Sequence, residues 1–325
     1  MRLIGLAVVL AVGLTLAPLA AEAQTAGQVY RIGFLGAASA RQYSAQVDAM
    51  RRGLRDLRYV EGRNLTIDYR WADGRYERLD PLAVELVRLK VDVIVTHGTP
   101  GSQAAKQATT TIPIVMAVVG NPEEIGLVQS LARPGGNITG SSFMFAEVNA
   151  KRVQVLKDAV PGLRRVAALY NPDNFSYVSV LAAMEPMSRS LRLVLHPVQV
   201  RQADDFETAF ARIKQQADGI VVIDDSMLIA NAGRLADLAI RFRLPIMGFK
   251  DLVDAGGLLA YGVDFPEVFR ESMVLVDRIL KGAKPGDLPI QRATKFELIL
   301  NLKTAKALGL TIPQSVLVRA DQVIE

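Results

Sequence analysis

Cysteine is absent from this chain of 325 residues. Without a thiol, the protein has no disulfide, no cysteine-based metal site and no nucleophilic cysteine. It also lacks the cysteine that a lipoprotein anchor requires. Exported proteins often use disulfides, but a chain of this length can bury enough apolar surface to be stable without them.

Histidine is nearly absent as well, since the chain has only His97 and His196. Two distant histidines without cysteine argue against a transition-metal site. The chain also lacks the Gly-x-Ser-x-Gly motif of serine hydrolases, the His-Glu-x-x-His motif of metalloproteases and the Gly-Lys-Ser/Thr ending of a phosphate-binding loop. We therefore expect a protein that is not an enzyme and that uses no cofactor.

Long runs of one charge are also missing. The net charge is +5, but the longest basic runs are the pairs Arg51-Arg52 and Arg164-Arg165. A protein that binds nucleic acid usually gathers its basic residues on one face. The scattered charge instead indicates an ordinary solvated surface, and no nucleic-acid partner is predicted.

The N-terminal residues have the pattern of a secretory signal peptide. Met1-Arg2 precedes an almost wholly apolar stretch from Leu3 to Leu16, and Ala21-Glu22-Ala23 supplies the small residues that signal peptidase recognises. The apolar stretch of about 14 residues is shorter than the roughly 20 that span a membrane. We predict a signal peptide at residues 1–23 and a periplasmic, freely diffusing monomer without a lipid anchor.

Two successive segments then show the same alternation of strands and helices. We predict strands of the first unit at residues 31–35, 65–71, 91–95 and 112–116, and strands of the second at 166–170, 193–200, 219–223 and 244–247. Short connections between alternating strands and helices imply parallel pairing with right-handed crossovers. The tail adds strands at 258–262 and 296–300 and a helix at 269–280, which indicates a chain that crosses between two lobes more than once.

Polar and aromatic residues follow the predicted strands at their carboxyl ends, where α/β sheets bind their ligands. Two such sheets facing each other would line a cleft from both sides. The candidate ligand-binding residues are Ser39, Thr99, Ser102, Asn121, Asn171, Asp225, Phe249 and Tyr261.

Several of these residues have a simpler structural alternative. The glycine-rich loop at residues 96–102 could hold a ligand carboxylate at the start of a helix, or its hydroxyls could cap that helix. Asp225 could accept a ligand ammonium or cap the next helix. Asp224 and Asp225 are adjacent at a strand end and should point in different directions, which disfavours a catalytic pair. Trp71 could pack against a helix or stack on a ligand, and His196 is expected to be structural.

Four stretches resemble one protein family. They are YRWADGRYERL at residues 69–79, TTTIPIV at 109–115, LARPGGNITG at 131–140, and FELILNLKTAK at 296–306 with GLTIP at 309–313. They look like the ABC-transporter substrate-binding family often called tryptophan/tyrosine-type, and the similarity runs from about Tyr30 to the C-terminus. The resemblance implies a type I periplasmic binding fold, in which two Rossmann-like lobes with parallel sheets clamp a ligand, and some relatives bind aromatic amino acids.

On this basis we expect lobe 1 to comprise residues 28–140 and 263–285, and lobe 2 to comprise residues 141–262 and 286–325. The expected function is a solute receptor that delivers an amino acid or an aromatic carboxylate to an ABC permease in the inner membrane. Two alternatives remain open at this point. An exported ligand sensor would share the fold, and an exported enzyme could use the same cleft.

Overall fold

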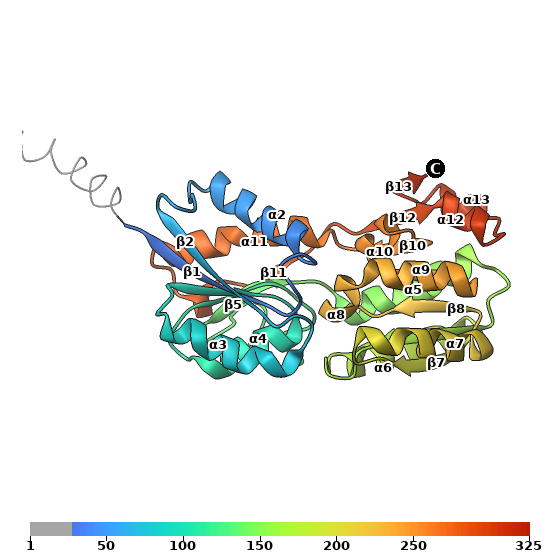
Figure 1. Ribbon diagram of the computed structural model, residues 1–325, viewed down its shortest axis with the longest axis horizontal. Coiled ribbons are helices and arrows are strands. Elements are labelled where there is room, and N and C mark those ends of the chain that lie inside the picture. The colour runs from blue at the N-terminus through green and yellow to red at the C-terminus, as the bar shows by residue number, and fades with distance from the viewer. Residues whose placement is uncertain (1–27) are drawn as a thin grey trace, which may run out of the picture.

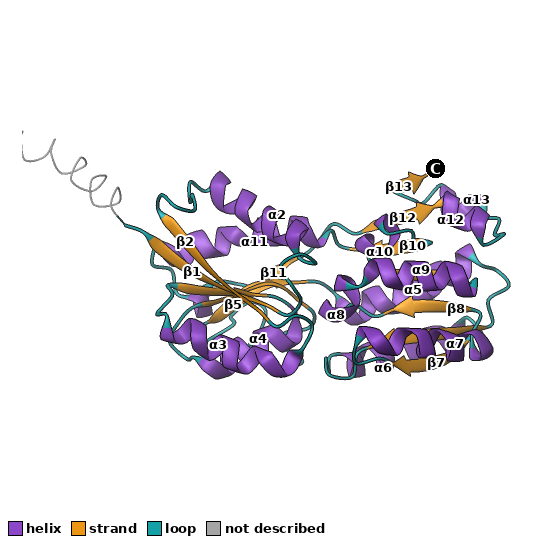
Figure 2. Cartoon of the chain, in the orientation of Figure 1, coloured by secondary structure: helices purple, strands orange, loops and turns teal. Residues whose placement is uncertain are grey.

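The computed structural model describes residues 28–325, which form two α/β lobes lying end to end (Figure 1). Each lobe has a central sheet with helices on both faces (Figure 2). The predicted signal peptide lies outside the described residues. No helix among residues 28–325 is long and apolar enough to cross a membrane. The two lobes confirm the fold class that the sequence predicts.

The sheet of lobe 1 has six strands, all parallel, in the order β11-β5-β4-β3-β1-β2. The strands are β1 (Tyr30–Gly36), β2 (Leu65–Trp71), β3 (Val93–Thr96), β4 (Ile114–Val119), β5 (Ile138–Ser142) and β11 (Gln291–Arg292). Its helices are α2 (Ser44–Asp56), α3 (Leu79–Arg88), α4 (Gly98–Ala108) and α11 (Phe265–Leu280), with short 3-10 turns η1 (Tyr76–Arg78) and η3 (Pro285–Asp287). Helices α2 and α11 cover one face and α3 and α4 the other (Figure 1).

The sheet of lobe 2 has seven strands in the order β13-β12-β10-β9-β8-β6-β7, and only β10 and β12 pair antiparallel among them. The strands are β6 (Arg165–Tyr170), β7 (Val194–Gln199), β8 (Gly219–Val222), β9 (Ile246–Gly248), β10 (Leu259–Gly262), β12 (Glu297–Asn301) and β13 (Gln322–Ile324). The longer helices are α5 (Phe145–Ala159), α6 (Tyr177–Ser190), α7 (Phe206–Gln216) and α9 (Ala232–Phe242). The shorter ones are α8 (Ser226–Ala230), α10 (Lys250–Asp254), α12 (Leu302–Ala307) and α13 (Gln314–Leu317), with a 3-10 turn η2 (Ala203–Asp205).

The chain crosses between the two sheets three times: after β5, after β10 and after β11. The first sheet extends to Ser142 and takes up Gln291–Arg292 near the end of the chain. The third crossing therefore comes after Arg292, later than the boundary at residue 286 that the sequence suggested. The reason is that the two-residue strand β11 pairs with β5. No pattern in the local sequence indicates a strand as short as β11.

The central strands are buried on both faces; β4 and β8 are continuous apolar runs, whereas β5 consists mainly of small and polar residues, Ile-Thr-Gly-Ser-Ser. Every residue of β3, β4, β5 and β8 is buried, as expected for parallel sheets with both faces covered. The half-buried Trp71 packs against Phe34 of the lobe 1 core, with ring centroids 5.1 Å apart, and lies over Gly36. Packing is therefore the observed role of this tryptophan.

One glycine sets how closely two helices approach. A Cβ atom at Gly53 of α2 would lie 2.5 Å from the backbone oxygen of Arg270 in α11. Only glycine permits this close approach of the two helices. Helix α2 therefore packs closely on α11, and its first turn carries Gln46, with Tyr43 just before it, at the pocket between the lobes.

Candidate ligand-binding site

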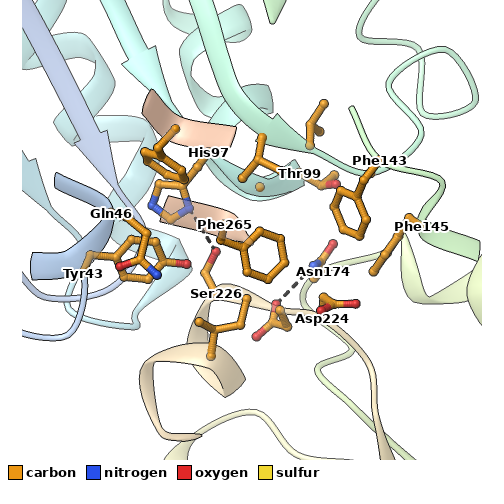
Figure 3. A pocket seen from close by; sticks show the side chains of 17 residues that line it. Tyr43, Gln46, His97, Thr99, Phe143, Phe145, Asn174, Asp224, Ser226 and Phe265 are labelled. Carbon is orange, nitrogen blue, oxygen red and sulfur yellow. Dashed lines mark hydrogen bonds between the residues drawn. The ribbon is translucent and has the colours of Figure 1, made fainter. Parts of the chain in front are cut away.

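A pocket lies between the lobes, at the ends of the strands where the two sheets meet (Figure 3). Both lobes and the first crossing contribute to its wall. The aromatic rings that line it belong to Tyr43, His97, Phe143, Phe145, Phe265 and Phe269. The polar side chains belong to Gln46, Thr99, Asn174, Asp224, Asp225 and Ser226. The pocket therefore combines an apolar wall with a small set of converging polar groups, as ligand sites usually do.

The aromatic rings pack against one another in two groups. Tyr43 stacks on His97 with ring centroids 4.3 Å apart. The ring of Phe143, on the first crossing, meets Phe145 and Phe265 edge-on, with centroids 5.4 and 5.7 Å away. These rings fix each other's orientation, so the apolar wall is preorganised.

His97 is buried, and its hydrogen bonds define its protonation. Its Nε2 accepts a hydrogen bond from the backbone N–H of Ala37 at 3.3 Å, so this nitrogen carries no proton. The remaining proton is then on Nδ1, which lies 3.4 Å from the hydroxyl oxygen of Ser226 in the other lobe. Burial lowers the pKa of His97 to about 3, so the ring is neutral at physiological pH.

Asp225 occupies the floor of the pocket in lobe 2 and is held by uncharged donors. It caps α8 by accepting hydrogen bonds from the backbone N–H groups of Met227 at 3.0 Å and Leu228 at 3.4 Å. The side-chain amides of Asn171 and Asn174 donate to it at 3.3 and 3.1 Å. Burial raises the pKa of Asp225, because no cation among the described residues pairs with it.

Asp224, by contrast, has a cationic partner. The guanidinium of Arg152 binds both of its oxygens, at 2.6 and 3.0 Å, and both side chains are buried. Arg152 also donates to the backbone oxygens of Tyr261 and Val222. The ion pair therefore ties α5 to β8 and β10 beneath the pocket and contributes no net charge there.

The two lobes make direct hydrogen bonds around the pocket, so the structure is closed. The hydroxyl of Tyr76 in lobe 1 donates to Asp225 at 2.7 Å and accepts from the N–H of Met227 at 3.2 Å. The hydroxyl oxygens of Thr99 and Ser176 lie 2.6 Å apart across the same interface. Tyr76 therefore joins the lobes through the carboxylate that lines the pocket.

The structure brings two of the eight sequence-derived candidates, Thr99 and Asp225, to the pocket wall. Asn171 lies behind Asp225 as a hydrogen-bond donor, and the hydroxyl of Ser102 donates to the backbone oxygen of Gly98. Asp225 serves as a helix cap and also lines the pocket, so capping does not exclude the predicted contact with a ligand.

The other four candidates lie away from this wall. The exposed Ser39 bonds to Gln42, and Asn121 lines a neighbouring hollow of about 400 Å³, which shares Phe143 with the pocket. Phe249 is fully buried in lobe 2. The ring of Tyr261 stacks on Phe296 with centroids 6.2 Å apart. These residues were selected because they follow strands at their carboxyl ends. That criterion applies to the whole edge of each sheet, whereas the pocket lies along only part of it.

Several pocket residues escaped the sequence analysis. Tyr43 and Gln46 lie around the start of the first helix and not directly after a strand. Phe143 and Phe265 lie at the first two crossings, just beyond the predicted boundaries at residues 140 and 262, but the sequence analysis did not select them. The signal that could have found them is the concentration of phenylalanine beside the predicted crossings. Among residues 28–325, no group of three or more histidine, aspartate or glutamate side chains is placed to hold a metal ion.

Two facing α/β lobes with three crossings and a pocket between them define a ligand-binding protein of the type I periplasmic class. The chain belongs to the ABC transporter substrate binding protein family, whose model matches residues 37–324. This match confirms the resemblance drawn from the four sequence stretches, and the family is one of binding proteins and not of enzymes.

Individual relatives agree with this assignment. A tyrosine-binding protein from Clostridioides difficile is 26% identical over 260 residues, which cover 80% of this chain and 75% of the relative. A conserved domain protein from Vibrio cholerae is 28% identical with a TM-score of 0.86, over 91% of this chain and all of that one. The ABC domain from Streptococcus pneumonia, solved in complex with L-Trp, is 25% identical with a TM-score of 0.85 over the same shares.

Proposed function

We propose that this protein is the exported solute receptor of an ABC importer and that it carries an amino acid between its lobes to a permease in the inner membrane. The observation that supports this most directly is the composition of the pocket, which offers separate groups for the two charges of a zwitterion. The similar proteins that bind tyrosine and L-Trp support the same ligand class.

The carboxylate of the ligand would bind at the start of α4. Gly98 and Thr99 line the pocket there, and the first N–H groups of a helix have no partner within it. Those N–H groups and the positive end of the helix dipole favour an anion. The hydroxyl of Thr99 adds a further donor. The N–H groups of α4 and the hydroxyl of Thr99 all belong to lobe 1.

The ammonium of the ligand would bind to lobe 2. Asp225 is a buried carboxyl group whose hydrogen-bond donors are all uncharged. The Oδ1 atom of Asn174 is buried at the pocket wall and has no hydrogen-bond partner. An ammonium would satisfy that oxygen and compensate the carboxylate. Each lobe would thus hold one end of the ligand, so a bound ligand favours the closed form.

Closure then provides the signal to the permease. A ligand that contacts both lobes shifts the population towards the closed state in proportion to its difference in affinity for the two states. The hydrogen bonds of Tyr76 and Thr99 join the two lobes, so separating the lobes would break them. A permease that docks on both lobes would therefore distinguish the loaded receptor from the empty one.

The proposed location follows from the N-terminal pattern. A signal peptide at residues 1–23, the absence of cysteine and the family assignment together favour a periplasmic protein that is not lipid-anchored and acts as a monomer. Fractionation of cells that express the full chain should place a shortened protein in the periplasm. Retention in the cytosol at full length would contradict export.

Thermal-shift screening of the purified protein against amino acids and aromatic carboxylates tests the binding function. A ligand present at 100 times its dissociation constant should stabilise the protein by about 2.7 kcal/mol. Asp225→Ala should abolish most of that shift, while Asn121→Ala, outside the pocket, should leave it unchanged. A shift that survives Asp225→Ala would remove this residue from the site. Uptake assays in a deletion strain then test import, because a sensor would be dispensable for uptake.

A further inference from the structure

Gln46 places a side-chain amide in the wall of the pocket from lobe 1. The residue belongs to the first turn of α2 and is only 1% exposed. Its Oε1 atom is buried and has no hydrogen-bond partner among the described residues. A buried polar atom without a partner costs free energy, and nearly all such atoms in folded proteins are paired. The protein therefore keeps an unpaired amide oxygen at a place that a ligand can reach.

The residues around Gln46 do not supply the missing partner. Tyr43 lies three positions before Gln46 and therefore on the same side of the start of α2. The ring of Tyr43 stacks on His97 with centroids 4.3 Å apart. The two ring nitrogens of His97 face the N–H of Ala37 and the hydroxyl of Ser226, so neither is left for Gln46. Rings thus form this part of the wall, and none of them gives Oε1 a hydrogen bond.

The amide of Gln46 is distinct from the group to which the ligand ammonium is assigned above. That group includes Asn174, whose unpaired Oδ1 atom belongs to lobe 2. Figure 3 shows the side chains of Gln46 and Asn174 apart, with the ring of Phe265 between them in this view. An ammonium bound at Asn174 and Asp225 therefore leaves Gln46 without a partner. Another part of the ligand must provide it.

The chemistry of an amide defines which ligand group suits Gln46. A hydroxyl or a carboxamide can donate to Oε1 and can also accept from the amide nitrogen. When the lobes are apart, water can reach the amide, but a ligand that displaces this water without replacing its hydrogen bonds loses affinity. A site built to hydrogen-bond a polar group therefore rejects an analogue of the same shape that lacks the group.

We propose that Gln46 binds the side chain of the ligand, and that the receptor selects an amino acid whose side chain carries a hydroxyl or a carboxamide over the apolar amino acid of similar shape. The inference rests on the proposed function and specifies its ligand class. It sets no limit on the size of the side chain, because it depends only on the group that meets the amide.

Calorimetric titration of the purified and dialysed protein tests the proposal with four pairs of amino acids of similar shape. The pairs are L-tyrosine with L-phenylalanine, L-threonine with L-valine, L-serine with L-alanine, and L-asparagine with L-leucine. The amino acid that binds most tightly should be the polar member of its pair. It should bind at least ten times more tightly than its apolar counterpart, which would leave the Gln46 amide unpaired.

Two variants assign the preference to Gln46. Gln46→Leu replaces the amide with an apolar group of similar volume, so the preference within the tightest pair should fall at least tenfold. Gln107→Leu, at an exposed position of α4 outside the pocket, should keep the preference. Without ligand, Gln46→Leu should unfold at the same temperature as the unmodified protein or at a higher one, because Oε1 loses no hydrogen bond. A merely structural glutamine would give a lower unfolding temperature and an unchanged preference.

The outcomes that would overturn the proposal are distinct. An apolar amino acid as the tightest ligand, or a preference of less than tenfold within the tightest pair, would refute the selection and leave the proposed receptor function intact. An equal preference in Gln46→Leu and the unmodified protein would refute the role of Gln46. Binding of none of the eight amino acids would also overturn the selection. Together with no thermal shift in the wider screen, that result would count against the proposed function itself.

Discussion

The buried histidine of the pocket should make the protein sensitive to mild acid. Burial lowers the pKa of His97 from the ordinary value of 6.5 to about 3. In the unfolded chain the imidazole takes up a proton as the pH falls below about 6.5, but in the folded protein it does not. The unfolded state therefore binds more protons in this range, and the free energy of unfolding falls as the pH decreases from about 6.5 towards 3.

The size of the effect follows from the separation of the two pKa values. Each unit of separation is equivalent to about 1.4 kcal/mol. Between pH 7 and pH 5 the difference in proton binding amounts to about 2 kcal/mol, since the unfolded histidine is almost fully protonated at pH 5 and the folded one is not. This is a substantial part of the 5–15 kcal/mol that typically stabilises a protein.

Urea unfolding of the unmodified protein and of His97→Gln at pH 7, 6 and 5 measures this contribution. Glutamine keeps one donor and one acceptor but does not titrate. Between pH 7 and pH 5 the free energy of unfolding should therefore fall by about 2 kcal/mol less in the variant than in the unmodified protein. The raised pKa of Asp225 acts in the opposite direction, but it is present in both proteins and largely cancels in the difference. His196→Gln serves as the matched control and should keep the full dependence. Parallel pH profiles for the unmodified protein and His97→Gln would refute the reasoning.

Three further variants test the interface, the buried ion pair and the helix packing. Tyr76→Phe removes a hydrogen bond that joins the two lobes and that separating them would break, so it should weaken ligand binding about tenfold in calorimetry; an unchanged dissociation constant would exclude a role in closure. Arg152→Met leaves Asp224 as an unpaired buried charge and should reduce the free energy of unfolding by about 3–5 kcal/mol in urea titration. A loss under about 1 kcal/mol would show that this charge is solvated or protonated instead. Gly53→Ala should cost about 1–3 kcal/mol because its Cβ meets backbone; Gly162→Ala, where nothing lies within 4 Å, should be nearly neutral, and equal losses would contradict the close helix contact.

Ten of the thirteen strands among residues 28–325 could be predicted because their signal is local, whereas β5, β11 and β13 were missed. The fully buried runs of β3, β4 and β8 are continuous apolar segments in the sequence, and the helices between them have apolar residues at helical spacing. The shorter elements α8, α10, α13 and β11 carry no such period. Their existence depends on what they pack against, so sequence reasoning did not find them.

The pocket could be predicted only in part. The rule that ligands bind beyond strand ends led to Thr99 and Asp225, since both follow a strand directly. It also led to Phe249 and Tyr261, which follow strands but lie outside the pocket. The rule identifies an edge of a sheet, whereas the pocket is the part of that edge that the opposite lobe covers.

The sequence by itself determined that this chain would build two similar α/β lobes, because hydrophobic periodicity acts over a few residues and is written along the chain. Only the tertiary structure decided which side chains meet between the lobes. Tyr76 and Asp225 are 149 positions apart, and His97 and Ser226 are 129 positions apart. Their contacts depend on the relative placement of two bodies joined by three crossings, and no local pattern encodes that placement.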